Sequence, residues 1–140
     1  MAPVSPSVPR AHARNADTGA QVAAVGVGSA GAASINGTDQ ENACYKGIKV
    51  VVDITALAGT APTVTVTIEG KDQASGKYYT LLASAALSAT GTVILTVYPG
   101  VTVTANVSAS DVLPKTWRVR TAGGGTITNA SFTVGATLIV

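Results

Sequence analysis

Side chains suited to acid–base chemistry, nucleophilic attack or metal binding are scarce in this chain of 140 residues. It has a single histidine, His12, and a single cysteine, Cys44. A catalytic triad needs a base held close to its nucleophile, and His12 follows a proline-rich stretch far from other candidates. A zinc site needs several histidine or cysteine ligands, which one of each cannot supply. We therefore expect no enzymatic activity, no catalytic residue, no metal and no cofactor.

Two minor alternatives concern the cysteine and the carboxylates. A single cysteine excludes an internal disulfide, and we expect Cys44 to be a small buried side chain, with an intermolecular disulfide or a reactive thiol as the alternative. A Ca²⁺ site built from carboxylates alone is conceivable at Asp39 and Glu41, or at Glu69 and Asp72. These acids stand beside predicted turns, so we interpret them as solvated turn residues.

Charge and aromatic side chains are also sparse. Charged residues make up 11% of the chain, against about 25% in an average globular protein. The net charge of +2 is too small for a dedicated nucleic-acid-binding surface, and aromatic residues, at 4%, are too few for a base-stacking platform. No apolar run reaches the roughly 18 residues that span a bilayer, so we expect no membrane contact. So few charges indicate a surface covered by other subunits, as in a homo-oligomer.

The first segment differs from the rest of the chain. Three prolines stand within its first nine residues, and proline cannot donate to a helix or a sheet ladder. Residues 1–18 are therefore predicted to form an extended arm that lies along a partner. Arg10 and Arg14 in this arm are candidate contacts for carboxylates of that partner. Residues 19–140 are predicted to form one β-sandwich domain.

Alternation is the strongest pattern in the remaining chain. Between residues 63 and 68, threonine at each odd position alternates with valine or isoleucine at each even position. Side chains of a strand point to opposite faces in turn, so one face is apolar and the other carries hydroxyl groups. This pattern is typical of an antiparallel sheet with one packed face and one exposed face.

Similar patterns predict about eight strands and no convincing helix. They cover residues 20–27, 45–55, 63–71, 78–82, 92–98, 101–108, 116–121 and 126–140. Gly and Pro signals predict a loop at 57–62 and turns at 72–77 and 123–125, and one helical turn is conceivable at 39–42. Strands at such spacing are typical of an all-β fold, here an antiparallel β-sandwich or jelly roll.

One predicted strand carries a candidate partner-binding patch. Arg118 and Arg120 are two residues apart, so they share one strand face, while Trp117 and Val119 share the other. Lys115 precedes them, and we interpret these cations as part of a solvated or subunit-facing strand rather than a nucleic-acid platform. Tyr78 and Tyr79 stand beside a turn and are candidate interface anchors, since tyrosine has an apolar ring and a polar tip.

From about Tyr45 onward the chain resembles a group of small virion proteins of tailed bacteriophages. Such proteins carry similar strands around a hairpin with an apolar residue, Glu, Gly or Ser, any residue and Asp, as in residues 68–72 here. The segments that carry the resemblance are residues 48–56, 59–72, 77–81, 116–120 and 131–134. The proline-rich arm lies outside it.

This resemblance implies a structural protein of the virion, assembled in the host cytoplasm. The nearest roles are a capsid decoration (cement) protein or a minor capsid protein that binds the lattice of the major capsid protein as an oligomer, for which we expect a trimer. The alternatives are a structural protein of the neck or tail, and a carbohydrate- or receptor-binding module of a fibre. In that last case Tyr78, Tyr79 and Trp117 are the candidate residues for stacking on sugars.

Overall fold

The computed structural model describes residues 20–23 and 35–140, with the side chains of the second range. The predicted arm, residues 1–18 with Arg10 and Arg14, lies outside the described residues. Of the first predicted strand, residues 20–27, only the segment Ala20–Ala23 is described, and it does form a strand.

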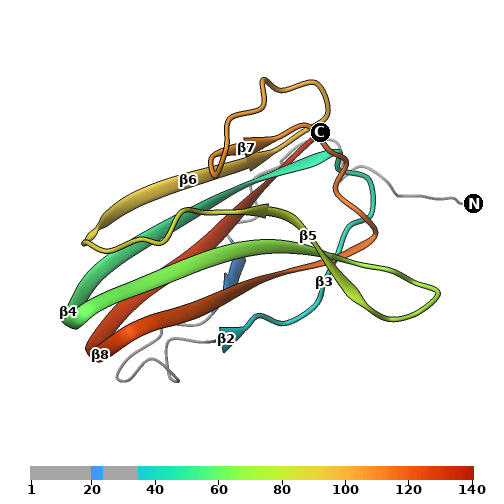
Figure 1. The fold of residues 1–140 in the computed structure, drawn as a ribbon. Coiled ribbons are helices and arrows are strands. Elements are labelled where there is room, and N and C mark those ends of the chain that lie inside the picture. The colour runs from blue at the N-terminus through green and yellow to red at the C-terminus, as the bar shows by residue number, and fades with distance from the viewer. Residues whose placement is uncertain (1–19, 24–34) are drawn as a thin grey trace, which may run out of the picture.

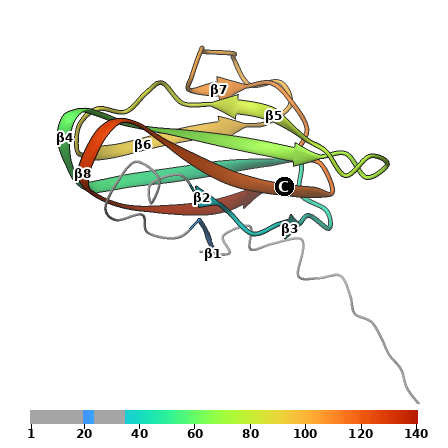
Figure 2. The ribbon, with the colours of Figure 1, turned by 60° about the horizontal axis from the view of Figure 1, so that its bottom comes forward.

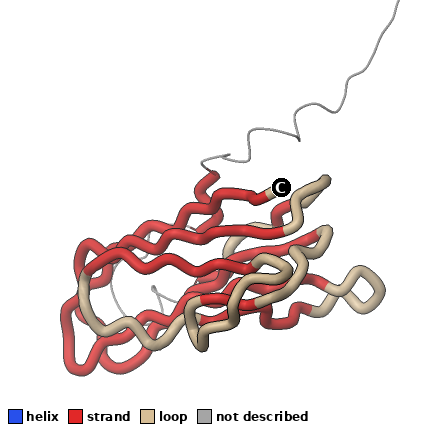
Figure 3. The backbone as a smooth tube through the Cα atoms, turned by 90° about the horizontal axis from the view of Figure 1, so that it is seen from above, coloured by secondary structure: helices blue, strands red, loops and turns tan. Residues whose placement is uncertain are grey.

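The described residues are all-β, as predicted, and contain no helix (Figure 3). Hydrogen bonds join all their strands into one mixed sheet, in which only β6 and β7 run parallel. The expected sandwich or jelly roll is not established, because the strands belong to a single sheet. The strands are β1 (Ala20–Ala23), β2 (Ile35–Asn36), β3 (Gln40–Glu41), β4 (Gly47–Lys71), β5 (Tyr78–Ala83), β6 (Gly91–Val97), β7 (Ser108–Ala109) and β8 (Thr116–Ile139).

Two very long strands, β4 and β8, organise the molecule. They pair antiparallel over nearly their whole length, from Gly47 opposite Ile139 to Gly70 opposite Trp117. Both strands bend together near their middle, at one end of the molecule, and then run back. Their two halves therefore lie in two layers (Figures 1 and 2). The first half of β4 pairs with β6, and the second half pairs with β5. The described edge segments β1, β2 and β3 all pair with β8.

The bend lies where the sequence predicts breaks in both long strands. The predicted loop 57–62 pairs with residues 126–130, and the predicted turn 123–125 follows directly along the ladder, with Gly124 opposite Thr63. The register shifts between Ala58 and Gly59 and again between Thr60 and Thr63. Such bulges bend a strand without ending it. Predicting a loop and a turn here was therefore wrong: each is a bulged part of a continuous strand.

Gly125 shows why the bend needs glycine. Its φ is +69°, a left-handed conformation that costs other residues free energy. A Cβ atom at this position would also collide with the backbone carbonyl of Ala61 on β4. The two long strands therefore approach each other more closely here than a side chain allows.

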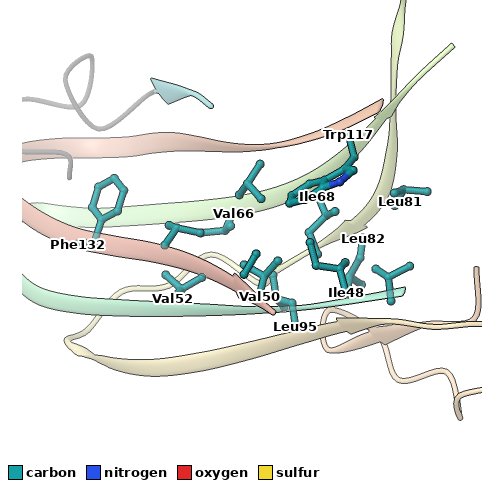
Figure 4. Close-up of a cluster of buried hydrophobic side chains, with 14 of the residues drawn as sticks. Ile48, Val50, Val52, Val66, Ile68, Leu81, Leu82, Leu95, Trp117 and Phe132 are labelled. Atoms are coloured by element: carbon teal, nitrogen blue, oxygen red, sulfur yellow. The ribbon is translucent and has the colours of Figure 1, made fainter. Parts of the chain in front are cut away.

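The apolar side chains of both halves meet in one core (Figure 4). Alternation places them there: Val64, Val66 and Ile68 are fully buried, as the pattern predicted. Val66 and Ile68 face residues from the first half of β4 such as Val50 and Val52 (Figure 4). The opposite, hydroxyl-bearing face is less open than expected, because Thr67 is only 6% exposed. The chain end is paired in the sheet through Leu138 and Ile139.

The tight turn between β4 and β5 follows the prediction. Gly76 has a φ of +74°, and the Asp72 carboxylate accepts hydrogen bonds from the backbone N–H and the hydroxyl of Ser75. These bonds lower the pKa of Asp72. The turn is thus held by its own side chains and leads directly into the predicted hairpin.

Three other expectations are wrong. The alternating segment 101–108 is mostly loop, because the Ser108 hydroxyl bonds its backbone at Thr102 and Thr104 and competes with a ladder. Residues 40–41 form β3 against β8 rather than a helical turn. Cys44 is exposed, because it lies in a bend outside the ladder that Asn42 stabilises through its bonds to Tyr45.

Candidate interaction surface

A cluster of charged side chains lies on the outward face of β8 and the second half of β4. Glu69 and Arg118 are cross-strand neighbours, and Arg118 Nε donates to Glu69 Oε1 at 2.7 Å. Arg120, two residues along β8 on the same face, donates from Nε to Glu69 Oε2 at 3.2 Å. One carboxylate therefore binds both arginines of the predicted patch.

Tyr78 connects this cluster to the segment before β3. The guanidinium of Arg118 lies 3.5 Å from the centroid of the Tyr78 ring, a favourable cation–π arrangement. The Tyr78 hydroxyl donates to Asp39 Oδ1 at 2.7 Å, while Lys71 Nζ binds Asp39 Oδ2 at 3.0 Å. The cluster of Asp39, Glu69, Lys71, Tyr78, Arg118 and Arg120 is called the arginine cluster below.

The contacts of Asp39 shift two pKa values. The hydrogen bond from Tyr78, followed by that from Lys71, lowers the pKa of Asp39, and the bond to Asp39 raises the pKa of Lys71. Because the pKa of Asp39 is lowered on folding, its contacts stabilise the fold at pH values above the pKa of the unfolded carboxyl group, and this stability is lost as the pH falls. Because the pKa of Lys71 is raised, its contact stabilises the fold at pH values below the pKa of the unfolded lysine, and this stability is lost as the pH rises. Both side chains are about one-third exposed, so solvent screening keeps the contribution small.

The arginine cluster keeps a small excess of positive charge. Three cations, Lys71, Arg118 and Arg120, stand against two anions, Asp39 and Glu69, which leaves +1. The Arg120 side chain is the most exposed of these, at 38%, whereas that of Arg118 is 16% exposed. Arg120 is therefore the arginine of this cluster best placed to meet a carboxylate of a partner.

The structure separates the predicted site residues. Arg118, Arg120 and Tyr78 come together, but Tyr79 lies over Gly70 beside Pro114, on the opposite face of β5, and is 45% exposed. Lys115 is exposed and takes no part in the ion pairs of the described residues. Trp117, the remaining sugar-stacking candidate, is buried at 2% exposure.

Sequence reasoning missed the two acids that hold the cluster together. Asp39 and Glu69 were interpreted as solvated turn residues, yet Glu69 is only 7% exposed. A signal existed, because Glu69 continues the hydroxyl-bearing face of the strand and opposite charges favour each other across a ladder. The register of β4 and β8, which the sequence does not reveal, was needed to identify Arg118 as its partner.

Replacing Glu69 with glutamine should lower the free energy of unfolding by about 2 kcal/mol, because two partly buried guanidinium groups lose the carboxylate that binds both. Urea denaturation followed by Trp117 fluorescence measures this change. The matched control is Lys71→Gln, which removes an exposed ion pair and should shift the midpoint much less. Equal midpoints for the two variants would contradict a central role of Glu69.

A second outward surface lies on the other layer, formed by β6, the first half of β4 and the last part of β8. Its residues alternate with buried core residues along each strand, and all of them are exposed or half-buried. Threonine is its commonest residue. This surface, called the threonine face below, consists of Thr92, Ile94 and Thr96 on β6, Lys49, Val51 and Asp53 on β4, and Thr133, Gly135 and Thr137 on β8.

The described residues show neither a cluster of metal ligands nor a membrane-spanning helix. Among the described residues, no group of three or more His, Cys, Asp or Glu side chains gathers in a way that could hold a metal ion. Over the same residues, no helix has the length and apolar character to cross a bilayer. Comparison with known proteins gives no match, neither to a protein-family model nor to a curated protein sequence.

Proposed function

We propose that this protein is a structural component of a virion, a capsid decoration or minor capsid protein that binds the lattice of the major capsid protein as an oligomer. The resemblance of residues 45–140 to small virion proteins of tailed bacteriophages supports this proposal. In the same proposal, the doubled-over sheet is the body of a β-sandwich, and the arm 1–18 reaches across neighbouring subunits. Ordering an arm on binding adds contact area without a larger folded body.

The observation that carries the proposal is the threonine face. A sheet surface of short hydroxyl side chains around a half-exposed Val51 and Ile94 suits contact with another protein surface. Short β-branched side chains lose little conformational entropy when they become buried. A surface of this kind favours docking over the turnover of a small substrate. The arginine cluster adds Arg120 as a contact for a carboxylate of the lattice.

A carbohydrate-binding module of a fibre is the second candidate, and the aromatic residues disfavour it. Sugar sites stack rings on exposed aromatic faces. Of the three candidates, Trp117 is buried, and one face of the Tyr78 ring is covered by the guanidinium of Arg118. Tyr79 alone is well exposed, which is a weak basis for a sugar site. A structural protein of the neck or tail remains the alternative within the virion.

Cosedimentation tests the proposed function. The full chain is mixed with empty shells assembled from the major capsid protein of the same virus, and we expect saturable binding with many copies per shell. Deletion of residues 2–17 should abolish this binding. Loss of shell binding in Arg120→Gln, but not in Lys77→Gln in the β4–β5 turn, would locate the contact. A full chain that does not pellet with shells would contradict decoration, and binding of a single ring per particle would indicate the neck or tail.

A further inference from the structure

The threonine face has nearly the same arrangement in both directions along its strands. Its centre row, which runs across the strands, consists of the cross-strand neighbours Ile94, Val51 and Gly135. On each side of this row lies a row with threonine, a charged residue and threonine. The two flanking rows are Thr92–Asp53–Thr133 and Thr96–Lys49–Thr137. They differ only in the sign of the central charge.

This arrangement is complementary to itself. A rotation by 180° about an axis along the centre row turns the face toward its own copy and exchanges the two flanking rows. Asp53 of one copy then faces Lys49 of the other, twice in the pair, and threonines face threonines. A contact between identical patches around a two-fold axis is the commonest form of homo-oligomer. We propose that the threonine face binds the threonine face of a second copy around this axis.

Among the described residues, the two charges of this face have no ion-pair partner. Lys49 is exposed and forms no ion pair among the described residues. Asp53 is half-buried, and its carboxylate accepts a long hydrogen bond of 3.4 Å from the Thr92 hydroxyl. By contrast, the acids of the arginine cluster are already paired. The threonine face therefore has one anion and one cation that lack an ion-pair partner within the described chain, at mirrored positions.

The apolar centre gives the contact its hydrophobic part. Ile94 is 49% exposed and offers apolar area that a contact would bury. Val51, its direct cross-strand neighbour, is half-buried. In the proposed pair, both side chains face their own copies at the axis, where water is excluded by the threonines around them.

The geometry tolerates the twist of the sheets. Each flanking row lies two residues from the axis, which is about 7 Å along the strand. Sheets pack face to face at about 30°, so the facing charges are displaced by roughly 3–4 Å, which a lysine side chain can span.

The contact area of this face is small. The three strands over the length of β6 cover roughly 350 Å² per copy, less than half of the about 800 Å² typical of stable complexes. The pairing is therefore weak and depends on a high local concentration.

This pairing deepens the self-association in the proposed function and rests on it. It also specifies the symmetry: a two-fold axis gives dimers, whereas the resemblance implied a trimer. On a capsid lattice, many copies held close together would raise the local concentration that a weak pairing needs.

A charge swap tests the proposal in sedimentation equilibrium of the full chain at low salt. We expect concentration-dependent dimers of the unchanged chain. The single variants Lys49→Asp and Asp53→Lys each place like charges opposite each other twice, so the dissociation constant should rise about tenfold. The double variant Lys49→Asp/Asp53→Lys restores opposite charges and should restore the dimer. Added salt should weaken the unchanged dimer and the restored dimer alike.

Two further variants separate this contact from any other. Ile94→Asp places two like charges at the axis and should abolish the dimer. Lys77→Asp, in the exposed turn between β4 and β5, changes charge by the same amount as Lys49→Asp and should leave the dimer unchanged. Circular dichroism confirms that each variant folds. A chain that stays monomeric at all concentrations, or a double variant as weak as the singles, would overturn the proposal; if that chain still bound shells, the virion role would stand without it.

Discussion

Replacing Gly125 with alanine is expected to lower the free energy of unfolding by about 3 kcal/mol. A left-handed φ costs a residue with a side chain about 1–2 kcal/mol. Relieving the collision of the new Cβ atom with the carbonyl of Ala61 adds a similar amount, because the bulged strands must move apart at the bend. Urea denaturation followed by far-UV circular dichroism measures the change.

Gly76 provides the matched control for this experiment. Its φ of +74° is close to the +69° of Gly125, but a Cβ atom at Gly76 would have no neighbouring atom within 4 Å. Gly76→Ala should therefore cost only the conformational part, about 1 kcal/mol. The difference between the two variants measures how tightly the long strands approach at the bend. Equal losses would show that close approach at the bend contributes nothing to stability.

Replacing Phe132 with alanine is expected to be the most destabilising change in the core, with a loss of about 3–5 kcal/mol. Phe132 is the only phenylalanine in the chain. It is fully buried opposite Ile54 and belongs to the core cluster (Figure 4). Its removal leaves a cavity that continuous, hydrogen-bonded strands cannot collapse to fill. Thermal unfolding should show a large fall in the melting temperature.

Two controls accompany Phe132→Ala. Phe132→Leu keeps most of the volume and should cost about 1–1.5 kcal/mol. Val103→Ala removes apolar volume from a side chain that is 67% exposed, and it should change stability by less than about 0.5 kcal/mol. If Phe132→Ala were as mild as Val103→Ala, the two halves of the long strands would not share one tightly packed core.

The candidate surfaces differ in how far the sequence predicts them. The spacing of Arg118 and Arg120 correctly placed both on one outward strand face, with Trp117 and Val119 inside. Their partner Glu69 is 49 and 51 residues away in the sequence, so only the register of β4 against β8 brings it to them. The threonine face likewise combines three strands far apart in the chain. The sequence of each strand alone shows only that polar and apolar residues alternate.

By itself, the sequence determined the all-β class, the hairpin around Gly76 and the inward face of each long strand. These features depend on local geometry, namely the period of two along a strand and the φ values that glycine permits. Only the tertiary structure decided that 57–62 and 123–125 continue their strands. Each segment alone has the composition of a break, but bulges in the ladder between the two strands let both bend together and keep their pairing. Whether a glycine-rich segment ends a strand or bends it depends on what lies opposite, which is a property of the assembled sheet.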